Sequence, residues 1–250
     1  RVEELELPGF EEYARGGLPF VLVDGMRGWG EELRKFLRPE ALWGMGRALE
    51  ERVDFYPTNM WSVEKKPELV TLREGLRRMG VAVGRGLGAA NGVGKELEQF
   101  PYLQWRLGVW AHEEVSRRAW GLPRMLQGEW WMDECLGEED GAQFVLLSAW
   151  KMVALGVEGS SMFYHSDDLR TGTWQAQVMG RKKWVLCDPR EEVAQRWCEE
   201  VVVEEGEIVF YPSHWGHQTL NLDTPTIGLV GRTVTRYNHR NVTQAIQAMC

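Results

Sequence analysis

Many short β-type segments divide the second half of the chain, and this feature limits its fold more than any other. The segments that follow Gly141 are rich in Val, Ile, Trp and Thr, and Gly, Pro and Asp separate them. Short strands at close spacing, with turn residues between them, are typical of an antiparallel sandwich or barrel. We expect strands at residues 144–150, 152–155, 173–178, 183–187, 201–203, 207–211, 217–222 and 226–230, with one helical interruption at 190–199.

Helical patterns dominate the first half of the chain. Apolar residues recur at helical spacing between residues 30 and 51, and Pro39 lies where a helix is expected to begin. A short strand is predicted at residues 20–23, and further helices at residues 69–79, 109–120 and 124–136. We therefore expect a mainly β protein with N-terminal helices, in which residues 1–100 pack on a barrel of residues 101–238 and residues 239–250 form a tail or helix.

Composition and charge exclude several classes of protein. Hydrophobic residues make up 44% of the 250-residue chain and charged residues 26%, which is ordinary for a globular protein and rules out disorder. No apolar run approaches the ~18 residues that a membrane-spanning helix needs. The net charge of −8 disfavours a broad basic face for nucleic acid. Neither nucleic acid nor a membrane is therefore the expected partner.

The four cysteines give no sign of a zinc site or of a disulfide framework. They stand at positions 135, 187, 198 and 250, without a CxxC pair. We therefore expect reduced cysteines in an intracellular protein, either cytoplasmic or nuclear. Because the chain opens at Arg1, we also expect that its N-terminus was trimmed and that any targeting signal was removed with it.

A glycine-rich stretch at residues 80–94 holds six glycines but completes no nucleotide-binding motif. The run from Gly84 to Gly88 lacks the third glycine of GxGxxG, and Gly94-Lys95 is followed by Glu96 where a P-loop needs Ser or Thr. A surface loop is the interpretation that remains.

Two histidines and one aspartate carry the strongest chemical pattern in the chain. His165 and Asp167 are two residues apart, so on an extended segment both side chains point to the same face. His217 begins a later strand, just beyond a turn at Pro212. Two histidines and a carboxylate on a β scaffold form the facial triad of non-haem Fe(II) oxygenases, which leaves metal positions open. An isolated HxD pair is more often a turn or a hydrogen-bonded pair, so the two segments indicate a metal only together.

The segments around these residues resemble a known family. The chain reads GVEGSSMFYHSD at residues 156–167 and WQAQVMGRKKWVLCDP at residues 174–189, and the His217 segment follows. Together they resemble the JmjC domain of 2-oxoglutarate oxygenases, in the style of the small hydroxylase-type members. The resemblance covers about residues 100–235 and implies a double-stranded β-helix, the jelly-roll of the cupin superfamily. The last segment nearly fits the cupin pattern G-x5-P-x-G-x2-H-x3-N, with His214 in place of its middle glycine.

The resemblance assigns a role to each residue of the triad and names the cofactors. His165, Asp167 and His217 match the ligands of Fe(II) in the family. The metal would bind the co-substrate 2-oxoglutarate and then O2. The softer alternative, a zinc–thiolate site, has no cysteine near enough in sequence.

The resemblance also places a co-substrate pocket. Lys182 matches the lysine that binds the distal carboxylate of 2-oxoglutarate, and Tyr102 matches a tyrosine that hydrogen-bonds the same carboxylate. Thr173 or Gln175 stands where the family commonly has an asparagine. The alternative for Lys182 is an exposed lysine in a turn after Gly180, and strand alternation favours the inward position. If residues 173–187 form a strand pair of the barrel, Trp174 and Lys182 point into the cavity and Lys183 points outward.

Two neighbours of the pocket are also notable. Gln104, two residues after Tyr102, matches a position that faces the substrate, and a polar residue at a sheet edge is the alternative. The family usually has a threonine three residues before the first ligand histidine, where this chain has Met162. This departure removes a hydrogen bond to the co-substrate.

The predicted function is that of an Fe(II)- and 2-oxoglutarate-dependent dioxygenase that hydroxylates a side chain of a protein or peptide. Three alternatives are a JmjC lysine demethylase, a tRNA-base hydroxylase and a cupin-type binding protein without turnover. The acidic net charge disfavours the second alternative. Met162 and the missing asparagine favour the cupin-type binding protein, whereas the complete triad and Lys182 argue against it.

Overall fold

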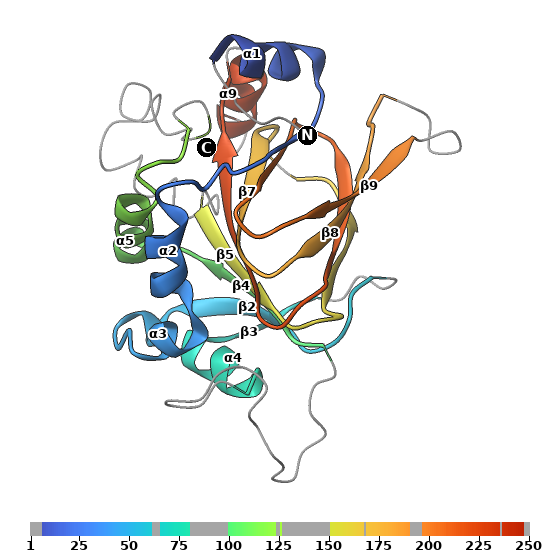
Figure 1. The fold of residues 1–250 in the computed structure, drawn as a ribbon. Helices are drawn as coiled ribbons and strands as arrows, with labels where there is room; N and C mark the ends of the chain where they lie inside the picture. The colour runs from blue at the N-terminus through green and yellow to red at the C-terminus, as the bar shows by residue number, and fades with distance from the viewer. Residues whose placement is uncertain are drawn as a thin grey trace.

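Two antiparallel β-sheets face each other and enclose a barrel, and helices cover the outer face of the larger sheet (Figure 1). The structure is a computed structural model that describes residues 7–61, 66–80, 100–123, 126, 151–167, 169–190, 197–235 and 237–247. The predicted mainly β class with N-terminal helices is confirmed by this arrangement.

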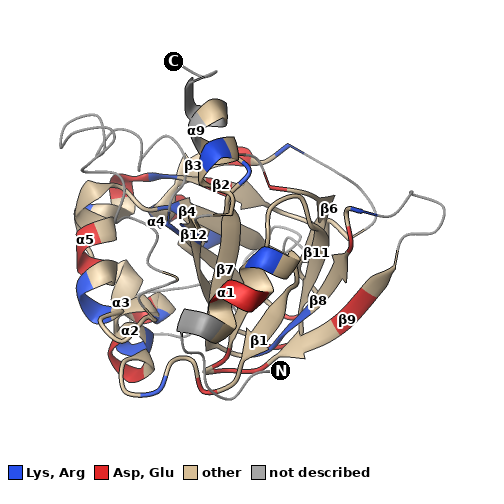
Figure 2. Cartoon of the chain, turned by 90° about the horizontal axis from the view of Figure 1, so that it is seen from above, with Lys and Arg blue, Asp and Glu red and all other residues tan. Residues whose placement is uncertain are grey.

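The larger sheet holds eight strands and the smaller sheet four. In spatial order the larger sheet contains β1 (Phe20–Leu22), β10 (Ile208–Tyr211), β7 (Gly172–Met179), β12 (Thr226–Thr233), β5 (Lys151–Gly156), β4 (Tyr102–Arg106), β2 (Arg52–Tyr56) and β3 (Glu68–Thr71). The smaller sheet contains β6 (Ser161–His165), β11 (Gly216–Asn221), β8 (Lys182–Cys187) and β9 (Cys198–Val203). Viewed from above, the smaller sheet lies across the barrel from β7 and β12 (Figure 2). Strands β1, β2 and β3 show that the first hundred residues also contribute to the larger sheet.

Alternation along β7 separates the two faces of the larger sheet. Trp174, Ala176 and Val178 are buried in the apolar core that also holds the helices. The residues that alternate with these three along β7 face the barrel interior, where Thr173 donates a hydrogen bond to Asp167. The prediction that Trp174 points into the cavity is therefore wrong, because a strand turns successive side chains to opposite faces. The co-substrate candidates Thr173 and Gln175 share the interior face instead.

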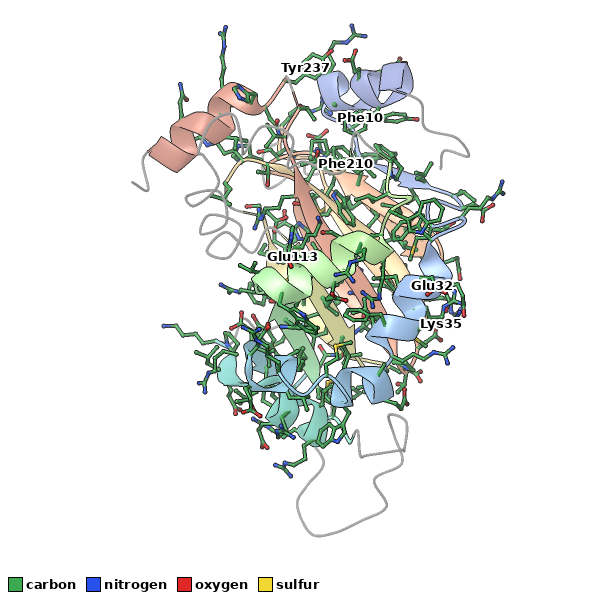
Figure 3. All side chains as sticks on the ribbon, turned by 90° about the vertical axis from the view of Figure 1, so that its left-hand side faces the viewer. Phe10, Glu32, Lys35, Glu113, Phe210 and Tyr237 are labelled. Carbon is green, nitrogen blue, oxygen red and sulfur yellow. A yellow bond between two sulfur atoms is a disulfide. The ribbon has the colours of Figure 1, made fainter. Side chains whose placement is uncertain are left out.

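The outer core forms where amphipathic helices bury their apolar residues against the larger sheet. These helices are α2 (Gly30–Leu37), α3 (Pro39–Trp43), α4 (Leu72–Arg78) and α5 (Val109–Arg118). Leu33, Leu76 and Val115 are fully buried, and each such side chain contributes roughly 1.5–3 kcal/mol through removal from water. Their polar residues face solvent, as Glu32 and Lys35 do on α2 (Figure 3).

Two further helices lie at the end of the barrel near Phe210. Helix α1 (Leu7–Gly16) packs there through Phe10, whose ring centroid is 5.4 Å from that of Phe210 (Figure 3). Helix α9 (His239–Gln247) follows the last strand. None of the helices in the described ranges is long and apolar enough to cross a membrane.

Several predicted helices differ from the structure. Residues 30–51 form three short pieces, because Arg38 is extended before Pro39, as the proline ring requires. The predicted helix at 69–79 begins only at Leu72, and the side chain of Thr71 caps it by accepting a hydrogen bond from the Glu74 amide at 3.2 Å. Cys198 and Glu199, predicted as helical, begin β9.

Other predictions fall outside the described residues. They are the strand at 144–150, the glycine-rich loop beyond Gly80, the middle of the 190–199 helix and, apart from Leu126, the 124–136 helix.

One cysteine prediction is also corrected. Cys187 and Cys198 are directly opposite each other on β8 and β9 and form a disulfide, with Cα atoms 4.0 Å apart. The sequence pattern missed this pair because the 190–199 segment was interpreted as helical, which hides the hairpin register that brings the two residues together.

Candidate metal centre and co-substrate pocket

The smaller sheet brings the three predicted metal ligands together. His165 ends β6 and Asp167 follows two residues later, while His217 lies on β11 directly opposite His165. One nitrogen of each histidine and one oxygen of the aspartate all lie within 4.8 Å of one another. The same-face relation that the HxD spacing predicts is therefore present, and the distant histidine joins it through strand pairing.

Backbone carbonyls orient both imidazoles toward the centre of the cluster. Nδ1 of His165 lies 2.8 Å from the carbonyl oxygen of Phe163, and Nδ1 of His217 lies 3.1 Å from that of Trp215. A carbonyl oxygen only accepts, so each Nδ1 donates a hydrogen and each Nε2 is the nitrogen left to bind a metal. Burial lowers the pKa of His217 to about 4, so this ring is neutral at pH 7, as a metal ligand must be.

Asp167 is held so that only one of its oxygens faces the histidines. Oδ1 lies 3.9 Å from Nε2 of His165 and 3.9 Å from Nε2 of His217. Oδ2 instead accepts two hydrogen bonds, one from the Thr173 hydroxyl at 2.6 Å and one from the Tyr211 hydroxyl at 3.0 Å. A carboxylate fixed in this way is prepared to bind a metal through one oxygen.

Asp167 is ionised in this environment despite its burial. Burial by itself raises the pKa of Asp167, but the charge that His217 carries once it is protonated, the charge of Arg232 and the Thr173 hydrogen bond outweigh burial and lower the pKa to about 2. Two imidazole nitrogens and one carboxylate oxygen on a β scaffold suit Fe(II) and leave coordination positions for other ligands. The residues present therefore fit the metal that the sequence predicts.

Lys182 is a buried ammonium group on the neighbouring strand β8. It is 1% exposed and lies opposite Asn221 of β11. Within the described parts of the chain, no carboxylate lies at ion-pair distance from its Nζ. Burial is the cause that lowers the pKa of Lys182, to about 7. A buried amine of this kind fits a ligand that brings its own carboxylate, because the charge is costly to bury unpaired.

The adjacent Lys183 shows the opposite behaviour. Its Nζ forms a 2.7 Å ion pair with Glu200 on the neighbouring strand β9, and its side chain is 28% exposed. Strand alternation thus turns Lys182 inward and Lys183 outward, in the phase that the sequence predicts.

The walls around Lys182 are largely apolar. Nζ of Lys182 lies 5.4 Å from the ring centroid of Tyr102, the second predicted co-substrate residue. Met162, in the place of the family's threonine, is buried against Tyr102, Tyr56 and Met60. The position therefore contributes packing to the pocket and no hydrogen-bond donor.

One polar atom beside Lys182 has no hydrogen-bond partner among the residues that the structure describes. Asn221 donates from Nδ2 to the Ser160 hydroxyl at 2.8 Å, and that hydroxyl donates its own hydrogen to Val157 at 2.6 Å. This chain of donors fixes the amide orientation and leaves the buried Oδ1 of Asn221 without a hydrogen bond. A lysine ammonium has three hydrogens and can donate to more than one acceptor.

The other predicted site residues take positions that the sequence did not specify. Thr173, predicted to contact the co-substrate, donates its hydroxyl hydrogen to Asp167, and Gln175 is buried and donates to Gln177 at 3.1 Å. Gln104 lies on the interior face of β4, opposite Asp54. Contact of these three residues with a co-substrate or a substrate stays a prediction.

Tyr211 is the site residue that sequence reasoning missed. It ends β10 opposite Thr173 of β7, and its hydroxyl lies 3.2 Å from Nε2 of His217. Burial holds its pKa well above the ordinary value, so the group is a phenol. Only the register between β10 and β7 reveals that this tyrosine reaches Asp167, and no local pattern carries that information.

Known proteins with related sequences include oxygenases and demethylases. No family model matches the chain. The 2-oxoglutarate and iron-dependent oxygenase JMJD4 of Homo sapiens is 32% identical in an alignment that covers 39% of this chain and 30% of that protein. JMJD4 of Danio rerio is 31% identical over 30% of this chain and 24% of its own length. The arginine-specific demethylase JMJ20 of Arabidopsis thaliana is 27% identical over 48% of this chain and 33% of its own length. The alignments thus span about a quarter to a third of these relatives.

Solved structures extend the similarity to the whole chain. The Escherichia coli ribosomal oxygenase YcfD superimposes with a TM-score of 0.54 at 15% identity, over 98% of this chain and 56% of that one. The chain has the JmjC-type double-stranded β-helix. A second structure of YcfD, in complex with cobalt and 2-oxoglutarate, gives the same TM-score of 0.54 at 14% identity, over 99% of this chain and 58% of that one. The predicted resemblance to the JmjC oxygenases is confirmed, and this JmjC-type fold places His165 and His217 on facing positions of its smaller sheet.

Proposed function

We propose that this chain is an Fe(II)- and 2-oxoglutarate-dependent oxygenase that hydroxylates a side chain of a protein. The observation that carries the proposal is the convergence of two oriented Nε2 atoms and one Asp167 oxygen in a barrel that also buries Lys182, for which the described residues offer no carboxylate partner. A bound metal accounts for the convergence of the three ligand atoms, and a ligand with a carboxylate accounts for the buried amine of Lys182.

Each residue has a defined task in this reaction. His165 and His217 would supply neutral nitrogen ligands, and Asp167 would supply one anionic oxygen. Bound iron would provide the dioxygen chemistry that amino-acid side chains lack. Lys182 would orient the co-substrate through a charge-assisted hydrogen bond, and the apolar wall around Tyr102 and Met162 would keep water from the pocket.

A protein substrate is supported by the names of similar proteins. The relatives include an arginine-specific demethylase, and the structural neighbours include a ribosomal oxygenase. The net charge of −8 also suits a basic protein partner better than the phosphate backbone of a nucleic acid. We therefore place the target on a side chain of a protein or peptide.

A turnover screen tests this function. The protein would be incubated with Fe(II), 2-oxoglutarate and an array of peptides rich in basic residues, and products would be read by mass. We expect a gain of one oxygen atom on at least one peptide, absent with the Asp167→Ala variant. Loss of a methylene unit from N-methylated peptides alone would contradict hydroxylation and leave demethylation as the activity. Equal product with the wild-type protein and the variant would contradict both.

A further inference from the structure

Tyr211 contacts two of the three proposed metal ligands through one hydroxyl group. Its side chain is buried at 3% exposure, at the end of β10. The hydroxyl oxygen lies 3.0 Å from Oδ2 of Asp167 and 3.2 Å from Nε2 of His217. The phenol is therefore part of the immediate surroundings of the cluster, although it is neither a histidine nor a carboxylate.

The hydroxyl has one hydrogen and two possible acceptors. His217 already donates its Nδ1 hydrogen to Trp215, so its Nε2 is able only to accept. Oδ2 of Asp167 also accepts from Thr173. A metal bound by His217 uses the Nε2 lone pair, and Oδ2 of Asp167 is then the remaining acceptor for the phenol.

We propose that Tyr211 is a positioning residue that directs its hydrogen bond to Asp167 and keeps that carboxylate as a one-oxygen ligand when a metal is bound. This inference rests on the metal site of the proposed function. Tyr211 and Thr173 would hold Oδ2 from the neighbouring strands β10 and β7, while Oδ1 faces the two histidines. These two hydrogen bonds would keep the second oxygen engaged, so that Asp167 would bind a metal through Oδ1 alone.

The hydroxyl, rather than the aromatic ring, is responsible for this role. The ring packs against Trp184, with centroids 5.6 Å apart, and phenylalanine preserves that packing. Tyr211→Phe therefore removes one hydrogen bond to Asp167 and little else. Thr173→Val removes the other hydrogen bond with a side chain of similar shape. Tyr56→Phe is the matched control, since Tyr56 is buried but belongs to the apolar wall.

Metal titration without co-substrate tests the inference. Mn(II) and Co(II) would be titrated into the wild-type protein and the three variants, and the visible spectrum of the Co(II) forms would be recorded. Replacing a residue that hydrogen-bonds a metal ligand weakens metal affinity about 10–100-fold. We expect that loss for Tyr211→Phe and for Thr173→Val, together with a changed Co(II) spectrum, and no change for Tyr56→Phe.

The outcomes separate this inference from the proposed function. If the wild-type protein binds no metal, the proposed function fails. If it binds metal and Tyr211→Phe binds equally well with the same Co(II) spectrum, the positioning role is wrong and the proposed function stands. If the Fe(III)-loaded protein shows a phenolate charge-transfer band that Tyr211→Phe lacks, Tyr211 is a direct ligand and the positioning role is again overturned. Should Tyr211→Phe fail to fold, as a thermal melt would show, Thr173→Val decides the question.

Discussion

The candidate metal centre and the surroundings of Lys182 differ in how far their polar groups are satisfied. At the candidate metal centre, backbone carbonyls hold both imidazoles, and two hydroxyls hold Asp167. Around Lys182, the described residues provide neither a carboxylate partner for its ammonium nor a hydrogen bond to Oδ1 of Asn221. The first region is organised before its ligand arrives, whereas the second needs its ligand to complete it. Four substitutions test this difference, and they are described from the largest expected effect to the smallest.

Asp167→Ala tests the candidate metal centre. It removes the only anionic ligand of the triad. Metal affinity should therefore fall by more than the ~10–100-fold that is lost when a residue hydrogen-bonded to a metal ligand is replaced. Metal content by elemental analysis and turnover by succinate formation should both be lost, while circular dichroism should show an intact fold. An unchanged metal content would refute the assignment of the triad.

Lys182→Ala tests the region in which the co-substrate is predicted to bind. An unpaired buried carboxylate costs about 3–5 kcal/mol, so the apparent 2-oxoglutarate constant should rise at least about tenfold, the equivalent of ~1.4 kcal/mol. Metal affinity should not change. Lys183→Ala is the control, because its side chain pairs with Glu200 on the outer face. Equal small effects of the two variants would mean that the co-substrate is anchored elsewhere.

Lys182→Met should stabilise the protein in the absence of co-substrate. The pKa of Lys182 is about 7 in the folded protein, against 10.5 for a lysine in water, so the unfolded chain binds more protons between these values. The free energy of unfolding of the wild type should therefore rise from pH 7 to pH 10 by about 1–4 kcal/mol relative to Lys182→Met. Denaturant titrations at both pH values measure this difference. Parallel pH dependences would show that Lys182 keeps its ordinary pKa.

Met162→Thr tests the wall of the pocket. A threonine hydroxyl adds a donor worth about 0.5–1.5 kcal/mol, so the apparent 2-oxoglutarate constant should fall about two- to tenfold. The smaller side chain leaves a cavity beside Tyr56 and Met60, so the melting temperature should also fall. An unchanged constant with a lower melting temperature would mean that residue 162 acts in packing alone.

The sequence predicted the strands of the barrel better than the helices that cover it. Segments such as 173–178 and 226–230 lie inside β7 and β12, because β-branched residues and turn signals mark them clearly. The helix at 69–79 was misplaced at its start, since the apolar residues of β3 also fit a helical period. Thr71 marks the true boundary through a capping hydrogen bond, which is visible only once the backbone is known.

The site was predictable where spacing within one segment decides it. His165 and Asp167 follow from an HxD on an extended strand, and the inward phase of Lys182 follows from the strand after Gly180. The face of Trp174, the role of Tyr211 and the Cys187–Cys198 bond depend on which strands pair and in what register. These relations join residues far apart in the sequence or across a misread hairpin, so no local pattern reveals them. The intracellular location and the domain boundaries stay predictions.

The conversion of 2-oxoglutarate to succinate tests the central claim most directly. The purified protein would be supplied with Fe(II), 2-oxoglutarate and O2, and succinate would be quantified beside Asp167→Ala and beside a sample without iron. We predict succinate formation that requires iron, that is lost in Asp167→Ala, and that needs more 2-oxoglutarate in Lys182→Ala. A wild-type protein that binds iron and 2-oxoglutarate but forms no more succinate than Asp167→Ala, with or without the peptide array, would contradict the claim and indicate a binding protein.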